Sequence, residues 1–458
     1  MRVPPRPGRV FPLAVPLLAG MLYAALSGCG GSASAPGAAP YLPLAPAKKG
    51  KYFTHIVIIV QENRTFDNLF ATYPGADGTT TGKTHDGKSI PLRKADLESI
   101  VAPNNGYKPY WLRDCNADVS QVCRMDGFDT VPIGKIPGTY VYKYVYPAQV
   151  APYWQMAKQF VLSDHTFQTQ GSGSFTAHQD LIRGGTEINA SESLIDFPND
   201  DPWGCTAPKG TVTSLITADN RYLGGQGPFP CLSYDTLRDL LDARQVTWRY
   251  YTPPNGNFAG DLWNAFEAIA AVRQGPEWST NVISPETLVF TDIGRDTLPA
   301  VSWVIPDFQN SDHPGDDSDT GPSWVAQVVN AIGESPAWTS TAILILWDDW
   351  GGWYDHVPPP GARRFGGLGF RVPLLAVSPY AKAGYVSHNQ YEFGSIVRFV
   401  EENWNLGSLG TTDATSPDFV HDFFDFTQKP RAFAPIQASY SKSYFLRQKP
   451  SLRPVDNE

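Results

Sequence analysis

The sequence predicts an α/β fold with a largely parallel central sheet flanked by helices. Three observations lead to this prediction. Short apolar runs recur along the 458 residues, amphipathic helical patterns lie between them, and two of the runs end in acidic or amide side chains. Strands that alternate with amphipathic helices are typical of parallel sheets. Open α/β sheets place their functional groups at the carboxyl ends of such strands.

Six apolar segments are the expected strands. Most of them are rich in β-branched and aliphatic residues, which suit strands buried on both faces of a sheet. They cover residues 56–60, 160–162, 247–251, 300–305, 342–347 and 372–377. Helices are expected over 175–182, 234–244, 322–332 and 395–404, where apolar residues recur at helical spacing.

The N-terminal 28 residues have the features of a bacterial lipoprotein signal peptide. Arg2, Arg6 and Arg9 precede an apolar run over 11–26, which is short for a membrane span. The run ends in Leu-Ser-Gly-Cys, which resembles the lipobox and makes Cys29 the expected lipidated residue. An ordinary secretory signal is the alternative.

The remaining chain divides by composition. Residues 29–50 are rich in Gly, Ala, Ser and Pro, and are expected to form a flexible tether. Residues 51–410 form the expected catalytic domain. Two loop-rich insertions, about 75–146 and 187–227, are expected to cap its active site. Residues 411–458 have little periodicity and are expected to wrap irregularly over the surface.

Cysteine content and charge limit the environment and the partners. Without Cys29 an even four cysteines remain, and proximity favours the pairs Cys115–Cys123 and Cys205–Cys231 among three possible pairings. Such bridges persist in an oxidising compartment, and no C-x-x-C spacing supports a zinc site instead. The net charge of −9 disfavours nucleic acid as a partner.

Oxygen-bearing side chains follow two of the expected strands. Glu62 and Asn63 come after the run 56–60, and Asp348 and Asp349 come directly after 342–347. Divalent cations prefer oxygen ligands of this kind. Two strands that both end in such residues predict a shared metal site, with a loop start and a helix cap as the alternative.

A serine opens one of the expected helices. Gly-Ser-Gly precedes Ser174, and His178 lies one turn further on the same face. Backbone amides at a helix N-terminus favour an anion, and a cation lowers the pKa of a nearby hydroxyl. Ser174 is therefore the candidate nucleophile, although a simple N-cap is possible and Ser172 is a rival. His313, in an acidic loop after a strand, is a candidate metal ligand or proton donor.

Together these segments resemble the bacterial phosphoesterase family of secreted acid phosphatases and phosphatidylcholine-type phospholipases C. The resemblance rests on IVQENRTFDNLF, Ser-Phe-x-x-His, Met-Asp-Gly-Phe, SDHP and WDDWGGWYDHVPPP. It implies an alkaline-phosphatase-like core and metal-assisted hydrolysis of phosphate esters. It assigns the metal ligands to Glu62, Asn63, Asp348 and Asp349, the nucleophile that touches the metal to Ser174, and histidines near the phosphate to His313 and His356.

The chain departs from the family at three elements. The histidine that usually lies shortly before Met-Asp-Gly-Phe is absent, and Asn116 and Asp118 occupy that neighbourhood. Ala177 stands where the family commonly has an amide, and Glu392-Phe393 stands where it has Asp-His. These changes put the substrate preference in doubt and leave the predicted metal ligands and nucleophile intact.

The expected function is a metal-dependent phosphoric ester hydrolase of the acid-phosphatase kind, acting through a phosphoserine. A phospholipase C acting on phosphatidylcholine-type lipids is one alternative, and a catalytically inactive surface-binding lipoprotein is another. One or two divalent ions are expected, with Zn²⁺, Mn²⁺, Mg²⁺ and Ca²⁺ all compatible. The protein is expected outside the cytoplasm, held to a membrane by its lipid anchor or secreted.

Overall fold

The computed structural model describes residues 44–99, 101–118, 122–361 and 364–455. They fall in the compact unit Leu42–Glu458. The predicted signal peptide, the lipidation site Cys29 and most of the tether lie outside the described residues. Within the described part, every helix is too short or too polar to traverse a bilayer.

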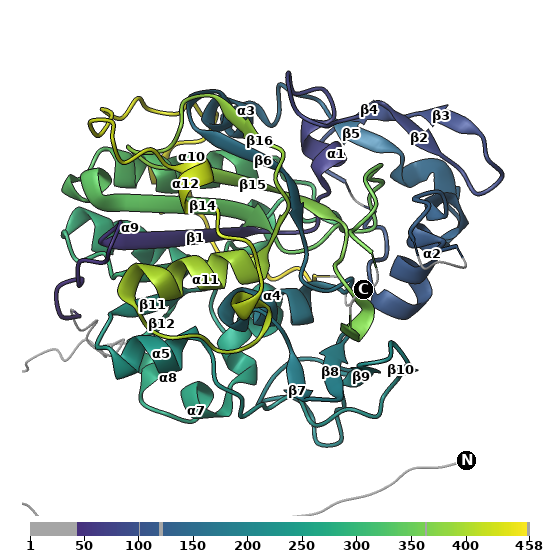
Figure 1. Cartoon of the computed structure of the whole chain (residues 1–458), viewed down its shortest axis with the longest axis horizontal. Helices are drawn as coiled ribbons and strands as arrows, with labels where there is room; N and C mark the ends of the chain where they lie inside the picture. Colours follow the sequence, from purple (N-terminus) through teal and green to yellow (C-terminus); the bar gives the residue numbers. More distant parts are fainter. Residues whose placement is uncertain (1–43, 100, 119–121, 362–363, 456–458) are drawn as a thin grey trace, which may run out of the picture. The chain divides into compact units, whose positions relative to one another are not determined.

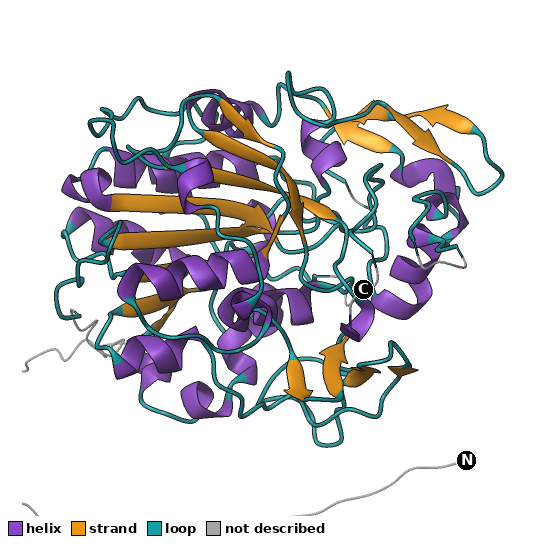
Figure 2. Cartoon of the chain, viewed as in Figure 1, coloured by secondary structure: helices purple, strands orange, loops and turns teal. Residues whose placement is uncertain are grey.

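One large mixed sheet forms the centre of this unit (Figure 2). All six predicted strands belong to it. In spatial order its strands are β12 (Val282–Ile283), β11 (Trp248–Tyr251), β13 (Val301–Val304), β1 (His55–Gln61), β14 (Thr341–Trp347), β15 (Arg371–Val377), β6 (Val161–Phe167) and β16 (Tyr385–Ser387), and β17 (Tyr391–Glu392) also pairs with β6.

The strand directions decide which side chains meet. The strands from β12 to β14 are parallel, whereas β15 runs antiparallel to both β14 and β6. Two reversals restore the direction, so β6 runs parallel to β1 and β14. The carboxyl ends of β1, β14 and β6 therefore lie at the same edge of the sheet. The predicted α/β fold with a largely parallel sheet is confirmed.

Helices cover both faces of the sheet (Figure 1). The four predicted helices form as α4 (Ser174–Arg183), α5 (Leu237–Ala243), α10 (Gly321–Gly333) and α11 (Phe393–Trp404). α11 contacts α4 and α5, while α10 contacts α3 (Ala151–Gln159) and α9 (Val289–Gly294). In α10 the apolar stripe is fully buried and Pro322 lies in the first turn, where its missing N–H is not needed.

Both predicted insertions carry small elements of their own. The first holds β2 (Thr81–Lys83), β3 (Ser89–Pro91), β4 (Arg93–Ala95), β5 (Lys143–Val145), η1 (Tyr107–Trp111), α2 (Leu112–Cys115), η2 (Phe128–Thr130) and η3 (Gly138–Val141). The second is more regular than expected. It forms an antiparallel sheet of β7 (Glu187–Asn189), β8 (Glu192–Ile195), β9 (Ser214–Thr217) and β10 (Tyr222–Leu223).

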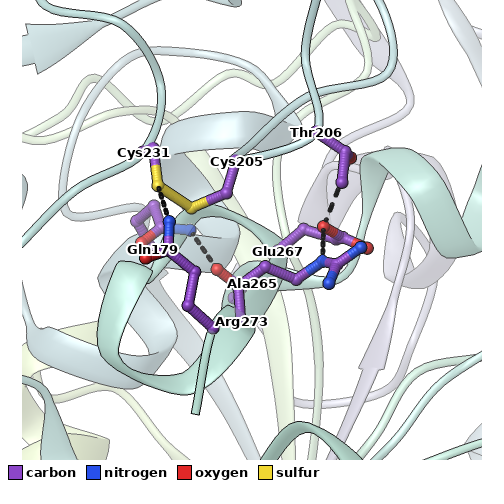
Figure 3. The surroundings of a disulfide bond; sticks show 8 residues. Gln179, Cys205, Thr206, Cys231, Ala265, Glu267 and Arg273 are labelled. Carbon is purple, nitrogen blue, oxygen red and sulfur yellow. Dashed lines mark hydrogen bonds and ion pairs between the residues drawn. A yellow bond between two sulfur atoms is a disulfide. The ribbon is translucent and has the colours of Figure 1, made fainter.

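Both predicted disulfides form. Cys115 pairs with Cys123 inside the first insertion, and Cys205 pairs with Cys231 across the second. Figure 3 shows the second bridge close to Gln179 of α4, whose amide donates to the carbonyl of Ala265 at 2.8 Å. The bridge thus lies beside the helix that begins at Ser174.

Short helices complete the structure. They are α1 (Phe66–Phe70), α6 (Phe258–Leu262), η4 (Ala265–Ala268), α7 (Ala270–Arg273), α8 (Glu277–Thr280), η5 (Glu286–Leu288), η6 (Phe308–Asn310), η7 (Pro336–Ser340), η8 (Arg364–Gly366), η9 (Thr412–Ala414), α12 (Val420–Phe423) and α13 (Lys442–Phe445). The last three are the helices described after residue 410, where most of the chain has no regular structure.

Candidate active site

The register of the central strands brings the first acidic residues together. Gln61 of β1 pairs with Trp347 of β14, so Glu62 and Asp348 leave the sheet side by side. The next amide, that of Asn63, donates to Asp348 Oδ1 at 2.9 Å. We call the five residues gathered here the nucleophile cage. They are Glu62, Asn63, Ser174, Asp348 and Asp349, each at most 1% exposed.

Glycine allows the chain after β14 to pass close to Asn63. Gly351 has φ +58°, and a Cβ at this position would lie 2.2 Å from the carbonyl oxygen of Asn63. A larger residue would therefore push the two strand ends apart. The second glycine, Gly352, has φ +70° and approaches the first insertion instead, where a Cβ would lie 2.6 Å from the carbonyl oxygen of Asn104.

Ser174 reaches the cage because β6 runs in the same direction as β1 and β14. The serine is the first residue of α4, and its Oγ lies 3.4 Å from Asn63 Oδ1 and 3.3 Å from Asp349 Oδ2. The preceding Gly173 packs under Phe197 of the second insertion, where a Cβ would lie 1.9 Å from the ring. The sheet, the helix and the insertion together fix the hydroxyl.

Asn105 is a site residue that the sequence reasoning missed. Its Nδ2 lies 2.8 and 2.9 Å from the two carboxylate oxygens of Asp349, and the Gly351 amide donates to Asp349 Oδ1 at 2.6 Å. Asn105 is fully buried and comes from the first insertion. Nothing in its surrounding sequence marks it, because that region lacks a strand or helix pattern.

His178 lies behind the cage and faces Glu62, not Ser174. Its Nε2 is 2.9 Å from Glu62 Oε1 and 3.8 Å from Asp348 Oδ2. Burial lowers the pKa of His178 to about 4, so the ring is neutral near pH 7. This geometry suits a residue that orients Glu62 or binds a metal. The spacing of four residues suggested that the ring would lie over the Ser174 hydroxyl, but the structure does not place it there.

The donor set fits a divalent cation. One ligand atom each from Glu62, His178 and Asp348 lies within 4.8 Å of the others, and all three residues are buried. Asp348 Oδ2 is a buried oxygen with no hydrogen-bond partner in the described part of the chain. A buried carboxylate oxygen is costly unless a cation or donor compensates it.

His313 lies at the border of the cage, as expected from its loop after β13. Its Nε2 is 3.0 Å from Asn63 Nδ2, and its Nδ1 faces the carbonyl oxygen of Pro314. The buried ring stands 5.5 Å from the Trp263 ring. The structure thus brings His313 to the nucleophile cage, and its role there stays a prediction.

His356 lies in a second cluster. Its Nδ1 is 2.7 Å from Asp67 Oδ2, and its Nε2 is 3.3 Å from Asp77 Oδ1. The buried guanidinium of Arg371 lies 3.0 Å from Asp355 and 3.4 Å from Asp67. We call Asp67, Asp355, His356 and Arg371 the arginine network. Both ring nitrogens of His356 are directed at carboxylates outside the cage, and its expected place near the substrate phosphate stays a prediction.

The sequence comparison identifies the family. The profile of the Phosphoesterase family matches residues 53–407, which is most of the chain. The chain belongs to this family.

Curated relatives of this phosphoesterase include bacterial enzymes named phospholipase C. It is 26% identical to a non-hemolytic phospholipase C of Pseudomonas aeruginosa, over 77% of this chain and 54% of the relative. It is 29% identical to phospholipase C B of Mycobacterium tuberculosis, over 83% of this chain and 79% of the relative. The chain spans about half the length of the first of these relatives.

Solved structures resemble the phosphoesterase more distantly. An alkaline phosphatase superfamily protein from Vibrio parahaemolyticus aligns at a TM-score of 0.37 and 10% identity, covering 84% of this chain and 75% of its own. A phosphonate monoester hydrolase of Agrobacterium radiobacter aligns at 0.33 and 10%, covering 77% and 73%. Both TM-scores lie below 0.5, so the family assignment comes from the sequence match alone.

A pocket of about 440 Å³ lies beside the cage of the phosphoesterase. Gly106 in its wall follows Asn105, and Phe197 in its wall covers Gly173. The pocket is therefore next to the two segments that hold Asp349 and Ser174. Its aromatic residues are Tyr110, Phe197, Trp203 and Tyr222, and its acidic residues are Asp196, Asp200 and Asp201.

Proposed function

We propose that this phosphoesterase hydrolyses phosphoric esters at the nucleophile cage, with Ser174 as the nucleophile. The observation that carries the proposal is the position of Ser174 Oγ, 3.3 Å from Asp349 Oδ2 and 3.4 Å from Asn63 Oδ1. A hydroxyl among carboxylate and amide oxygens, at the first residue of a helix, suits attack on a phosphate.

The cage residues would hold one or two divalent ions. Glu62, Asn63, Asp348 and Asp349 supply the oxygen ligands, and His178 supports Glu62 or binds directly. A bound cation would lower the pKa of the serine hydroxyl and neutralise charge on the phosphate. Oxygen donors with one histidine are compatible with Zn²⁺, Mn²⁺, Mg²⁺ and Ca²⁺.

The proposed reaction has two steps. The Ser174 hydroxyl loses its proton to solvent, its Oγ attacks phosphorus in line, the bond from oxygen to phosphorus forms, and the ester bond to the leaving alcohol breaks. His313, at the border of the cage, gives the proton that the alcohol needs. Water then attacks the phosphoserine, phosphate leaves, a proton from the water restores the serine hydroxyl, and His313 regains its proton from solvent. His356 has no part in these steps, because its ring nitrogens are directed at Asp67 and Asp77.

A matched pair of serine variants tests the nucleophile. Ser174→Ala is expected to lower kcat for nitrophenyl phosphate or its phosphocholine ester by at least ~10³-fold, the range for loss of a nucleophile. Ser172→Ala is the control, because Ser172 Oγ accepts a hydrogen bond from the Asp196 amide at 2.9 Å and belongs to the neighbouring loop. Full turnover by Ser174→Ala would remove the serine from the mechanism.

The pocket favours a phospholipase C type of substrate as the second candidate function. Aromatic faces and carboxylates together suit a quaternary ammonium group such as a choline headgroup. The pocket combines Tyr110, Trp203 and Tyr222 with Asp200 and Asp201. The rival is a phosphomonoesterase of the acid-phosphatase kind. Release of phosphocholine from phosphatidylcholine, compared with release of phosphate from nitrophenyl phosphate, separates the two.

We also propose that the protein works outside the cytoplasm, with Cys29 as its lipid anchor. Two disulfides support an oxidising compartment. Mass spectrometry of the mature N-terminus in a native host tests the anchor, since a lipidated Cys29 has a distinctive mass. An inactive binding lipoprotein would show neither turnover nor bound metal.

A further inference from the structure

A third cluster of ligand-type side chains lies at the middle of β6, apart from the nucleophile cage. Asp164 and His165 belong to β6, and His388 follows β16. Ser387 of β16 pairs with Ser163 of β6, so His388 leaves the sheet opposite Asp164. One ligand atom from each of the three side chains lies within 4.8 Å of the others.

The sheet is irregular at this point. The next pair is Tyr391 with Thr166, so three residues from His388 onward face only Asp164 and His165. On the other side of β6, the pairing with β15 also shifts register between Val372 and Leu374, and such irregularities are common next to functional sites.

Asp164 carries an oxygen that is left for a ligand. The residue is fully buried, and its Oδ2 accepts from the Asp77 amide and faces His388 Nδ1, both at 2.8 Å. Its Oδ1 has no hydrogen-bond partner in the described structure and lies 3.4 Å from His165 Nδ1. Arg371 donates to the carbonyl oxygen of Asp164 at 2.8 Å.

The other nitrogen of His165 is arranged as in metal sites. His165 Nε2 lies 3.1 Å from Asp77 Oδ2. Histidine ligands usually donate their second N–H to a carboxylate in this way, which fixes the tautomer and leaves the other nitrogen for the metal. Nδ1 is then the candidate ligand atom, and it lies 3.0 Å from the carbonyl oxygen of His388 and 3.4 Å from Asp164 Oδ1. Two ligands at ~2.0–2.1 Å from a tetrahedral zinc ion lie ~3.3 Å apart. The separation between His388 Nδ1 and Asp164 Oδ2 is 2.8 Å, and that between His165 Nδ1 and Asp164 Oδ1 is 3.4 Å, so both are close to this value.

We infer that Asp164, His165 and His388 form a second metal site, which binds a transition-metal divalent ion such as Zn²⁺. Two imidazoles and one carboxylate are the donors that such ions prefer. His388 has a side chain that is 59% exposed, so solvent completes the coordination. The ion ties the segment after β16 to β6, the strand that leads to Ser174.

Metal content of the full-length protein tests the site. After chelation, dialysis and reloading with Zn²⁺, His388→Ala is expected to hold one ion fewer per chain than the unmodified protein. Co²⁺ loading should likewise lose one set of visible absorption bands. Turnover of nitrophenyl phosphate by His388→Ala should stay within ~2-fold, because His388 is outside the cage. His421→Ala, which removes another exposed histidine, is the control and should keep full metal content.

A second variant and a contrary result complete the test. Asp164→Asn removes the buried carboxylate and should show the same loss of one ion. If it fails to fold, the exposed His388→Ala still decides the question. Equal metal content in the unmodified protein, His388→Ala and His421→Ala would overturn the inference. That result would leave the proposed hydrolase unaffected, because the cage shares no residue with this site.

Discussion

The nucleophile cage and the arginine network are both buried clusters built around aspartates, but the negative charge of these aspartates is compensated in different ways. In the arginine network, Arg371 lies within 3.4 Å of Asp67 and Asp355 and supplies a permanent cation. In the cage, Asp348 Oδ2 has no hydrogen-bond partner in the described part of the chain, and the neutral ring of His178 lies 3.8 Å away. The network is complete by itself, whereas the cage fits an ion from outside.

This contrast shows that one motif serves two purposes. In WDDWGGWYDH, the first acidic pair enters the cage, and the later Asp355 and His356 enter the network. The two glycines between them separate the halves by turning the chain. Ligand atoms of Asp67, Asp355 and His356 also lie within 4.8 Å of one another. There the guanidinium of Arg371 takes the place that a metal has in other clusters.

The largest expected effect is in the cage, where one substitution should lower activity and raise stability. Asp348→Asn should lower kcat/KM by ~10³-fold or more, because loss of a metal ligand removes several kcal/mol of transition-state stabilisation. In the metal-free protein the same change should raise the melting temperature, since it removes a buried charge that lacks compensation. Activity assays and thermal melts in chelator measure both. A lower melting temperature in chelator would contradict the comparison.

The opposite pattern is expected in the arginine network. Arg371→Met should cost about 3–5 kcal/mol of unfolding free energy, because it leaves two carboxylates buried without their cation. Urea unfolding measures the loss. Arg398→Met is the matched control, since Arg398 forms a partly exposed helix pair with Glu402 and should cost about 0.5 kcal/mol or less. Equal losses in the two variants would show that Arg371 is not the internal cation.

The smallest expected effect is a pH dependence that belongs to the network. Burial lowers the pKa of His356, but the hydrogen bond and charge of Asp67 outweigh it and hold the pKa above its usual value. Protonated His356 therefore stabilises the fold fully below the unfolded pKa of ~6.5, and this stabilisation is lost as pH rises through the folded pKa.

Urea midpoints between pH 5 and pH 9 test this dependence. At low pH the unfolding free energy of the unmodified protein should be higher than that of His356→Gln by about 1 kcal/mol or less. The difference should shrink as pH rises. A difference that grows with pH would mean that the neutral ring is the stabilising form.

The sequence predicted the sheet and the cage acids well, for a physical reason. Strand-end residues such as Glu62 and Asp348 sit at positions that parallel pairing alone brings together, so apolar runs with polar ends are enough to find them. Ser174 could also be found, because glycines and a helix start surround it. These residues depend on local patterns that are visible in one dimension.

Asn105 and His356 show where the sequence reasoning ended. Asn105 reaches Asp349 through an insertion without periodicity, so its partner depends on tertiary packing that no local pattern encodes. His356 shares a motif with Asp349, and the motif gave no sign that the chain turns away from the cage after Gly352. Arg371, which forms an ion pair with the neighbouring Asp355, lies on a different strand.

The two insertions pack against the loop before Ser174, where Trp111 lies against Gly171 and Phe197 lies against Gly173. The proposed reactive residues thus lie at the strand ends, while the walls of the neighbouring pocket come from the two insertions. Grafting the 187–227 segment of another family member onto this scaffold should change which esters are accepted and leave the bond-breaking apparatus in place. Substrate preference within the family would then change through the insertions more readily than through the strand ends.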